Sequence, residues 1–324
     1  MAEWTYAEAI RQALTDAMAE DDAVLLLGED VALGGPFGVT RGLRERFGAG
    51  RVLNTPISEA AITGFAVGAA LAGRRPVVEI MFMDFITLAL DMLANQAAKL
   101  ALLSGFQQAV PLVVRTQAGI YHSAGAQHSQ SLEAWLVHVP GLAVVAPGVA
   151  NDAYRAVRWA LRQPGPVVVM EHKGLYGRRQ AREALEWDPQ WRPGPQLRRP
   201  GRDATVVTYS AMGETALAAA SALERDGISV EVWDLLGLSP LNLEPVLESV
   251  RRTHRVLIVH EAVVTGGLGA ELAARLQSEV FDDLDAPIFR LGGRPVAIPF
   301  SPPLERAVIP SAEAVAEAVR TVLA

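Results

Sequence analysis

The chain has 324 residues, a net charge of −7 at pH 7 and no cysteine. A length of this order predicts two domains, each large enough for its own hydrophobic core. The lack of cysteine excludes disulfides, thiolate metal sites and a cysteine nucleophile. The acidic balance, without a basic tail, excludes nucleic acid as an expected partner.

The chain is unusually apolar for its charge content. Half of its residues are hydrophobic and its mean hydropathy is +0.21, although 20% of the residues are charged. No apolar run reaches the ~18 residues that a membrane span needs without a polar or glycine break, so no membrane partner is expected. A large obligate subunit interface would account for the apolar excess. The N-terminus lacks the charged and apolar regions of a signal peptide, which predicts a cytoplasmic protein.

Short apolar runs alternate with helical stretches in the first part of the chain. These runs are near-continuously apolar, as the strands of a buried parallel sheet are. Residues 1–180 are therefore predicted to form a doubly wound α/β domain. Glu29 follows the first run, at the end of the strand where ligands approach such sheets. The predicted strands are residues 23–27, 76–81, 111–115, 142–145 and 166–170.

A carboxylate begins the most apolar helix predicted in the chain. Ser58 is expected to cap this helix, and Ile57 and Ile62 to pack across the cap as a hydrophobic staple. Residues 60–73 carry no charge, and a helix that is apolar on every side is expected to be buried on every side. Glu59 is then either satisfied by the helix dipole or a functional acid that meets a ligand.

The helix predicted over residues 84–104 carries one narrow polar stripe. Thr87, Asp91, Asn95 and Lys99 recur every four residues, and almost all other positions are apolar. Two interpretations remain open. The helix is a core helix with one solvated edge, or it packs in a subunit interface where the stripe pairs with another chain.

A polar loop at residues 125–131 is a candidate site. It combines small residues with His128 and four other hydrogen-bonding side chains, and it has neither a strand nor a helix period. This composition is typical of a loop at a functional site. His128 taken alone could equally be a structural hydrogen-bonding histidine. His122, in the preceding loop, is a second candidate or a plain surface residue.

Prolines, tryptophans and arginines interrupt the alternation at residues 181–202, which predicts an extended linker. Residues 203–324 are predicted to form a second, smaller doubly wound α/β domain. A glycine-rich run at residues 266–269 superficially resembles a dinucleotide-binding loop but lacks the third glycine of that fingerprint, so the start of a helix is the preferred interpretation. The strands of this domain are predicted near residues 204–209, 228–233, 256–260 and 287–290.

Several short motifs follow one another in an order found in one family. They occupy residues 28–31, 55–59, 75–85, 95–99, 127–133, 139–142 and 259–261. Over most of its length the chain resembles the beta subunit of the heteromeric, thiamine-diphosphate-dependent 2-oxoacid dehydrogenase E1 components, which act on pyruvate, branched-chain 2-oxoacids or acetoin. The resemblance implies a transketolase-like pyrimidine-binding domain followed by a transketolase C-terminal-like domain.

The activity implied by this resemblance is oxidative decarboxylation of a 2-oxoacid with transfer of the acyl group to lipoamide. An acetoin dehydrogenase E1 beta subunit, or a non-catalytic subunit that keeps the fold, are the alternatives. A nicotinamide-binding oxidoreductase with the same sheet architecture is a third hypothesis. Retention of thiamine diphosphate, NAD or neither would separate them.

The resemblance also implies roles for individual side chains. Glu59 would hydrogen-bond the pyrimidine ring of the cofactor, and Met81 and Phe85 would contact and stack on that ring, a role that suits a thioether and an aromatic face. His128 would stabilise the reaction intermediate or transfer protons to it, as imidazoles commonly do. Glu29 and His122 are candidates for contacting and orienting these residues without touching the cofactor themselves. The catalytic pair is thus Glu59 and His128.

The chain lacks the Gly-Asp-Gly and Asn-Asn motifs with which thiamine enzymes hold the diphosphate and its divalent metal. The resemblance therefore implies that an alpha subunit holds the diphosphate and Mg²⁺, with no metal ligand from this chain. It also implies an assembly of two alpha and two beta chains, a structural K⁺ ion, and an E2 lipoyl acyltransferase as partner.

Overall fold

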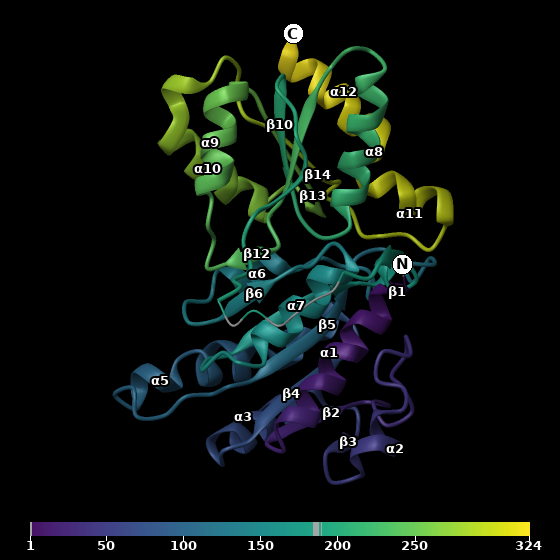
Figure 1. Ribbon diagram of the computed structural model, residues 1–324, viewed down its shortest axis with the longest axis vertical. Helices are drawn as coiled ribbons and strands as arrows, with labels where there is room; N and C mark the ends of the chain where they lie inside the picture. Colours follow the sequence, from purple (N-terminus) through teal and green to yellow (C-terminus); the bar gives the residue numbers. More distant parts are fainter. Residues whose placement is uncertain (1, 184–187, 189) are drawn as a thin grey trace. The chain divides into compact units, whose positions relative to one another are not determined.

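The computed structural model describes residues 2–183, 188 and 190–324, and it divides into two compact units (Figure 1). The first unit comprises Met1–Ala118 and Trp135–Pro193. The second comprises Gly119–Ala134 and Gly194–Ala324, so the candidate loop around His128 packs within the second unit although it lies early in the sequence. The domain limits at 180 and 203 remain a prediction.

The first unit contains a parallel sheet with the strand order β6-β7-β5-β4-β2-β3. Every strand predicted in this part of the chain is present, and the short β3 was not predicted. Helices α1 (Tyr6–Glu20) and α7 (Ala150–Ala160) pack side by side over the sheet (Figure 1). The strands are β2 (Val24–Gly28), β3 (Val52–Asn54), β4 (Arg75–Ile80), β5 (Val113–Ala118), β6 (Ala143–Val145) and β7 (Val167–His172).

The first unit also contains short elements that sequence periodicity does not predict. The strands β1 (Glu3–Thr5) and β8 (Arg179–Ala181) pair antiparallel in a small separate sheet. A capping box between Thr5 and Glu8 fixes the start of α1. The short helices α2 (Leu43–Phe47) and η3 (Lys173–Leu175) and most of α6 (Glu133–Val137) also lie in this unit, and α5 (Leu100–Leu103) ends the helical segment that was predicted over residues 84–104.

The second unit contains a sheet with the strand order β14-β13-β10-β11-β9. All pairs are parallel except that β9 runs antiparallel to β11. Helices α8 and α12 cover one face, where alanines, valines and leucines form the core. The strands of this sheet are β9 (Gln196–Arg199), β10 (Ala204–Thr208), β11 (Val230–Asp234), β13 (Val256–Val263) and β14 (Phe289–Gly293), and the short β12 (Gly237–Ser239) is not part of it. The helices are α8 (Met212–Glu224), α9 (Glu244–Thr253), α10 (Leu268–Val280), η4 (Phe281–Asp283), α11 (Pro302–Val308) and α12 (Ala312–Leu323).

The segment predicted as a linker, residues 181–202, is not a connection between domains along its whole length. Its residues 196–199 form β9, which is hydrogen-bonded to the edge of the second sheet. Trp187 and Pro189, which belong to the same prediction, lie outside the described residues.

Helix α3 (Glu59–Leu71) corrects two expectations. It packs against β4 on one side, but Phe65 is 57% exposed on the other, so the expectation of burial on every side is wrong for this chain alone. The apolar composition of a helix does not show whether its outer face is covered within the same chain. Ile57 is 72% exposed, so it forms no staple with Ile62, and the Ser58 side chain makes no capping hydrogen bond.

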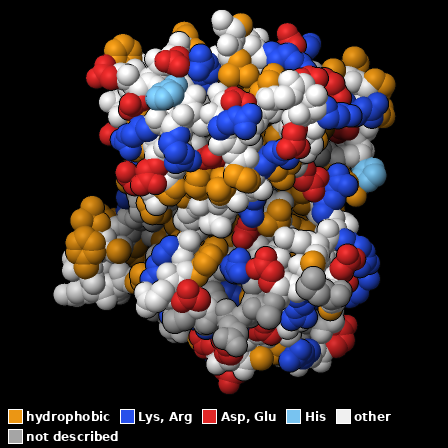
Figure 2. All heavy atoms as spheres, turned by 45° about the horizontal axis from the view of Figure 1, so that its top comes forward, with side chains coloured by type: hydrophobic (Ala, Val, Ile, Leu, Met, Phe, Trp, Pro, Cys, Tyr) orange, Lys and Arg blue, Asp and Glu red, His pale blue; other side chains and the backbone are white. Residues whose placement is uncertain are grey.

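The helix predicted over residues 84–104 is a series of helical turns of different types. It comprises η1 (Met83–Phe85), α4 (Ile86–Asp91), the π-helical η2 (Met92–Ala97) and α5. Residues 83–103 are long and apolar enough, by length and composition alone, to cross a membrane, and only a minor part of this segment is buried in the chain. Such a segment is weak support for a span, and exposed hydrophobic side chains also gather on the protein surface (Figure 2).

Candidate functional site

Glu59 is the first residue of α3, and its exposed fraction is only 9%. Its side chain accepts no hydrogen bond and forms no ion pair with any residue that the structure describes. Burying a carboxylate is costly unless it meets a partner, and the helix dipole alone offers only partial compensation. Glu59 therefore combines low exposure of its side chain with the lack of a protein partner among the described residues, which makes it a candidate for contact with a ligand.

Glu29 lies close enough to Glu59 for their charges to interact. It follows β2, and its pKa is raised by burial, then by the negative charges of Asp30 and Glu59. Two neighbouring carboxylates disfavour each other's ionised form. The structure thus brings two of the predicted acids together in the first unit.

Met81 and Phe85 lie just after β4, where the chain turns through η1 into the helical segment. Both side chains are half-buried. Phe85 packs edge to face with Phe82, with 6.0 Å between ring centroids. The Nζ of Lys173, a buried lysine, lies 5.4 Å from the centre of the Phe82 ring. Phe85, one of the two predicted ring contacts, therefore belongs to an aromatic cluster that also holds one cation.

A buried ionic network joins three neighbouring strands of the first sheet, and it was not predicted from the sequence. Arg115 on β5 donates to Glu171 on β7 at 2.6 and 2.8 Å, and to Glu79 on β4 at 2.5 Å. Tyr176 donates its hydroxyl to Glu171 at 2.6 Å. Burial raises the pKa of Glu79, which Arg115 partly offsets. The available signal was a charged residue at Glu79, Arg115 and Glu171, each within or directly after an apolar run that predicts a buried strand.

His128 and His122 lie in the second unit, on the loop of residues 119–134. His128 is half-buried, and its backbone N–H donates to the carbonyl oxygen of Gly125 at 3.3 Å. His122 is exposed, and its ring packs edge to face against Tyr121 with 3.9 Å between centroids. The two histidines thus belong to one loop but differ in exposure.

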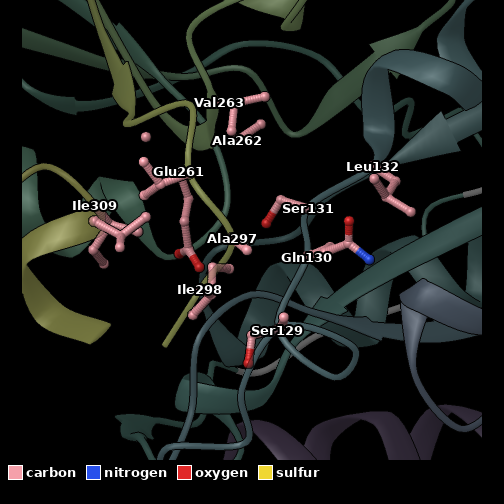
Figure 3. A pocket seen from close by; sticks show the side chains of 14 residues that line it. Ser129, Gln130, Ser131, Leu132, Glu261, Ala262, Val263, Ala297, Ile298 and Ile309 are labelled. Atoms are coloured by element: carbon pink, nitrogen blue, oxygen red, sulfur yellow. The ribbon is translucent and has the colours of Figure 1, made fainter. Parts of the chain in front are cut away.

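A cavity of about 320 Å³ adjoins this loop within the second unit (Figure 3). The 129–132 segment lines it on one side, and residues of β13 and of the chain around α11 line the other. Glu261 carries the one ionisable side chain of this lining. Its Oε1 accepts the backbone N–H of Ile120 at 2.6 Å. The carboxylate therefore serves the loop that carries His128.

The glycine-rich run at residues 266–269 packs against a histidine. Added Cβ atoms at Gly267 and Gly269 would lie 2.8 and 2.4 Å from atoms of the His260 ring. These glycines are therefore required by the close approach of α10 to the imidazole. The packing against His260 accounts for both glycines without a bound nucleotide.

No group of three or more His, Asp or Glu side chains is arranged to hold a metal ion within residues 2–183, 188 and 190–324.

Two family matches cover most of the chain. Residues 2–179 match the transketolase pyrimidine-binding domain, and residues 195–315 match the transketolase C-terminal domain. Among solved structures, a split-gene transketolase described as an inactive beta4 tetramer has a TM-score of 0.77 at 24% identity, covering 98% of each chain. Transketolase from Leishmania mexicana has a TM-score of 0.73 at 16% identity, covering 100% of this chain and 46% of that one. These two likenesses concern the fold.

The curated relatives are named as subunits of one enzyme. The pyruvate dehydrogenase E1 component subunit beta of Rickettsia felis is 42% identical over 98% of both chains. The protein of that name from Rhizobium meliloti is 40% identical over 99% of this chain and 70% of its own length. The mitochondrial beta-2 subunit from Oryza sativa is 40% identical over 98% of this chain and 86% of its own. The chain consists of a transketolase pyrimidine-binding domain and a transketolase C-terminal domain, and it belongs to the family of E1 component beta subunits of the 2-oxoacid dehydrogenases.

Proposed function

We propose that this chain works with an alpha subunit to decarboxylate a 2-oxoacid and pass its acyl group to the lipoyl group of an E2 acyltransferase. The names of the relatives favour pyruvate as the substrate. Thiamine diphosphate, when bound, supplies a nucleophilic carbon and a sink for the electron pair that decarboxylation releases. The observation that carries the proposal is Glu59 itself, a residue only 9% exposed whose side chain has no hydrogen-bond or ion-pair partner among the described residues.

Glu59 and the other residues predicted to contact the cofactor offer groups that suit the pyrimidine end of thiamine diphosphate. Glu59 offers a hydrogen-bond acceptor or, when protonated, a donor to a ring nitrogen in a site with little water. The hydroxyl of Thr55 is also buried and has no partner among the described residues. Met81 and Phe85 supply a polarizable and an aromatic surface for a flat heterocycle. The donor set is thus complementary to an aminopyrimidine.

The other predicted residues have supporting parts in this proposal. Glu29 lies near enough for burial and the charges of Asp30 and Glu59 to raise its pKa, which favours its protonated form beside the proposed site. His128 exchanges protons with the substrate-derived oxygen and helps transfer of the acyl group, since imidazole is a donor or an acceptor near neutral pH. His122 is exposed and stays an additional candidate for substrate contact.

The diphosphate, Mg²⁺ and substrate contacts outside this chain are proposed to come from the alpha subunit. The sequence lacks the motifs that hold a diphosphate and its metal. The exposed apolar face of α3 supports packing against another chain in an assembly of two alpha and two beta subunits. A structural K⁺ ion and a cytoplasmic location complete the proposal.

The decisive experiment is Glu59→Gln in the chain co-expressed with its alpha subunit. The amide keeps the size of the side chain but loses the ability to hold or release the proton, so kcat with pyruvate should fall by about 10²- to 10⁴-fold. Assembly should be unchanged. Turnover is measured with an artificial electron acceptor in place of E2, and thiamine diphosphate affinity is measured separately.

Glu244→Gln is the matched control. Glu244 is the first residue of α9, as Glu59 is of α3, but it is exposed. The control reports the loss of a charge at a helix start without a ligand contact, and its kcat should stay within twofold. A Glu59→Gln enzyme with near-normal kcat would contradict the proposed role.

A further inference from the structure

The loop that carries His128 is held by carboxylates from a distant part of the sequence. Ile120 donates its backbone N–H to Glu261 at 2.6 Å. Ser123 donates its backbone N–H to both oxygens of Glu305, at 3.0 and 3.2 Å. All four residues belong to the second unit. Hydrogen bonds to an ionised acceptor are stronger than those between neutral groups, so these contacts can hold a loop in one conformation.

The loop needs such support because of its backbone conformation. His122 and Ser123 have φ angles of 51° and 58°, the left-handed region that side chains other than glycine rarely adopt. Two such residues in succession persist only when their surroundings fix them. Glu305, on α11, is 5% exposed and binds the second of them. The buried carboxylate and the strained turn therefore stabilise each other.

Further contacts lie on either side of His128. An added Cβ at Gly125 would lie 2.4 Å from the ring of Phe300, so this ring covers the turn closely. The carbonyl oxygen of the same glycine accepts the backbone N–H of His128. At the far end of the loop, Tyr209 donates its hydroxyl to Glu133 at 2.5 Å. The loop is thus tied down before and after the histidine.

We infer that Glu305 is a positioning residue for the reaction: by binding Ser123 it holds the 119–131 loop in the conformation that presents His128. The inference rests on the proposed role of His128. It gives the C-terminal part of the chain a function in turnover, in addition to stabilising the fold. Glu305 need not touch the substrate, because a displacement of a catalytic group by about 1 Å can lower a rate by about 100-fold.

The test compares Glu305→Ala in two backgrounds, the native assembled enzyme and the His128→Ala enzyme. In the native background, kcat should fall by about 10- to 100-fold with KM changed less than about threefold. In the His128→Ala background, the same substitution should cost less than about twofold, since residues that act as one unit are not additive. Glu305→Gln keeps an oxygen that accepts from Ser123, so it should restore most of kcat.

Amide hydrogen exchange provides a readout that does not depend on turnover. Exchange in residues 120–131 should be faster in Glu305→Ala than in the native enzyme, and close to native in Glu305→Gln. Glu271→Ala, which removes an exposed carboxylate from α10, is the control and should change neither kcat nor exchange. If Glu305→Ala fails to assemble, Glu305→Asp replaces it in the same comparison, because the shorter side chain keeps the charge but draws the carboxylate away from the backbone N–H of Ser123.

The outcomes separate this inference from the proposed function. An impaired His128→Ala enzyme beside a Glu305→Ala enzyme with normal kcat would overturn the inference alone. Equal losses from Glu305→Ala in both backgrounds would also overturn it, because they would show a role independent of His128. Normal kcat in His128→Ala would remove the proposed role of the histidine and the inference with it.

Discussion

Arg115 and Glu171 are joined by two parallel hydrogen bonds at a point where neither side chain reaches solvent. The guanidinium also binds Glu79, so one positive charge serves two buried carboxylates from the strands on either side of β5. Burial opposes the charge of Arg115, but Glu171 and Glu79 together raise its pKa. Both acids depend on this single cation, which makes it the member of the network whose loss costs most.

Arg115→Met should therefore destabilise the chain strongly. Removing one partner of a buried ion pair leaves an uncompensated charge and typically costs about 3–5 kcal/mol. Urea unfolding followed by circular dichroism measures the change in midpoint, with slopes compared to check that the transition keeps its cooperativity. A loss below about 1 kcal/mol would mean that the carboxylates accept protons or water without strain.

The matched control for this prediction is Arg320→Met. Arg320 forms an ion pair with Asp226 at 2.7 Å, but both side chains are substantially exposed. Exposed pairs contribute about 0–1 kcal/mol, because water screens the charges and the long side chains lose conformational freedom. The same chemical substitution should therefore shift the unfolding midpoint little at the surface.

His260 predicts a loss of stability in mild acid. Burial lowers the pKa of its imidazole from 6.5 to about 4, against an opposing hydrogen bond to Ala262. As the pH falls, the His260 side chain of the unfolded chain takes up a proton near pH 6.5, whereas that of the folded chain takes it up only near pH 4. The stabilisation is therefore present above pH 6.5 and is lost as the pH falls to about 4. The difference corresponds to about 3 kcal/mol.

His260→Asn tests this pH dependence. The amide nitrogen can still donate to the carbonyl oxygen of Ala262, which the ring Nδ1 contacts at 2.9 Å, but it does not titrate in this range. The difference in unfolding midpoint between native and variant proteins should shrink between pH 7 and pH 4. A difference that stays constant with pH would contradict the prediction, because it would show that His260 has the same pKa in the folded and the unfolded chain.

Gly269→Ala should destabilise the second unit. Its Cβ would lie 2.4 Å from the Nε2 of the buried His260, which cannot move away, so overpacking should cost about 1–3 kcal/mol. Gly213→Ala in α8 is the control, because nothing lies within 4 Å of the added Cβ. There, alanine should be neutral or stabilising by up to about 1 kcal/mol. Thermal unfolding compares the two, and equal shifts would contradict the packing argument.

The sequence was sufficient for the elements whose pattern is local. The central strands of both sheets lie in near-continuous apolar runs, and burial on two faces produces that pattern directly. The strands β1, β8 and β9 were missed because they are short and partly polar, and they depend on antiparallel partners remote in the sequence. Apolarity identified α3 as a helix, but it could not tell a covered face from an exposed one.

The candidate site was predicted unevenly for a similar reason. Glu59 stood out because a charge at the start of an apolar helix is unusual within a short window. Glu305 could not be found in this way, since it lies 182 residues from the serine that it binds. The Arg115 network joins three strands that only the fold makes adjacent. Contacts of this kind have no spacing that a sequence pattern can reveal.

The helical segment with the polar stripe leads to a prediction about assembly. Thr87, Asp91 and Asn95 are exposed, and Asn95 donates to Asp91 at 2.6 Å, which fits a solvated edge in the isolated chain. The packing of this segment against another subunit stays a prediction. It is supported by the exposed side chains at its end, since Phe106 is 77% exposed beside a cavity of about 770 Å³.

Phe106→Ser should therefore impair assembly with the alpha subunit while leaving the fold of the chain intact. Truncating a large apolar side chain at the centre of an interface costs about 2 kcal/mol or more, a weakening of about 30-fold or greater. Leu33→Ser is the control, because Leu33 is equally exposed, at 78%, but lies outside this segment. Sedimentation of the co-expressed subunits measures assembly, and flotation with lipid vesicles examines the membrane alternative. Unchanged assembly with vesicle binding would show that the apolar segment meets lipid, whereas loss of assembly in Phe106→Ser alone would place it at a subunit contact.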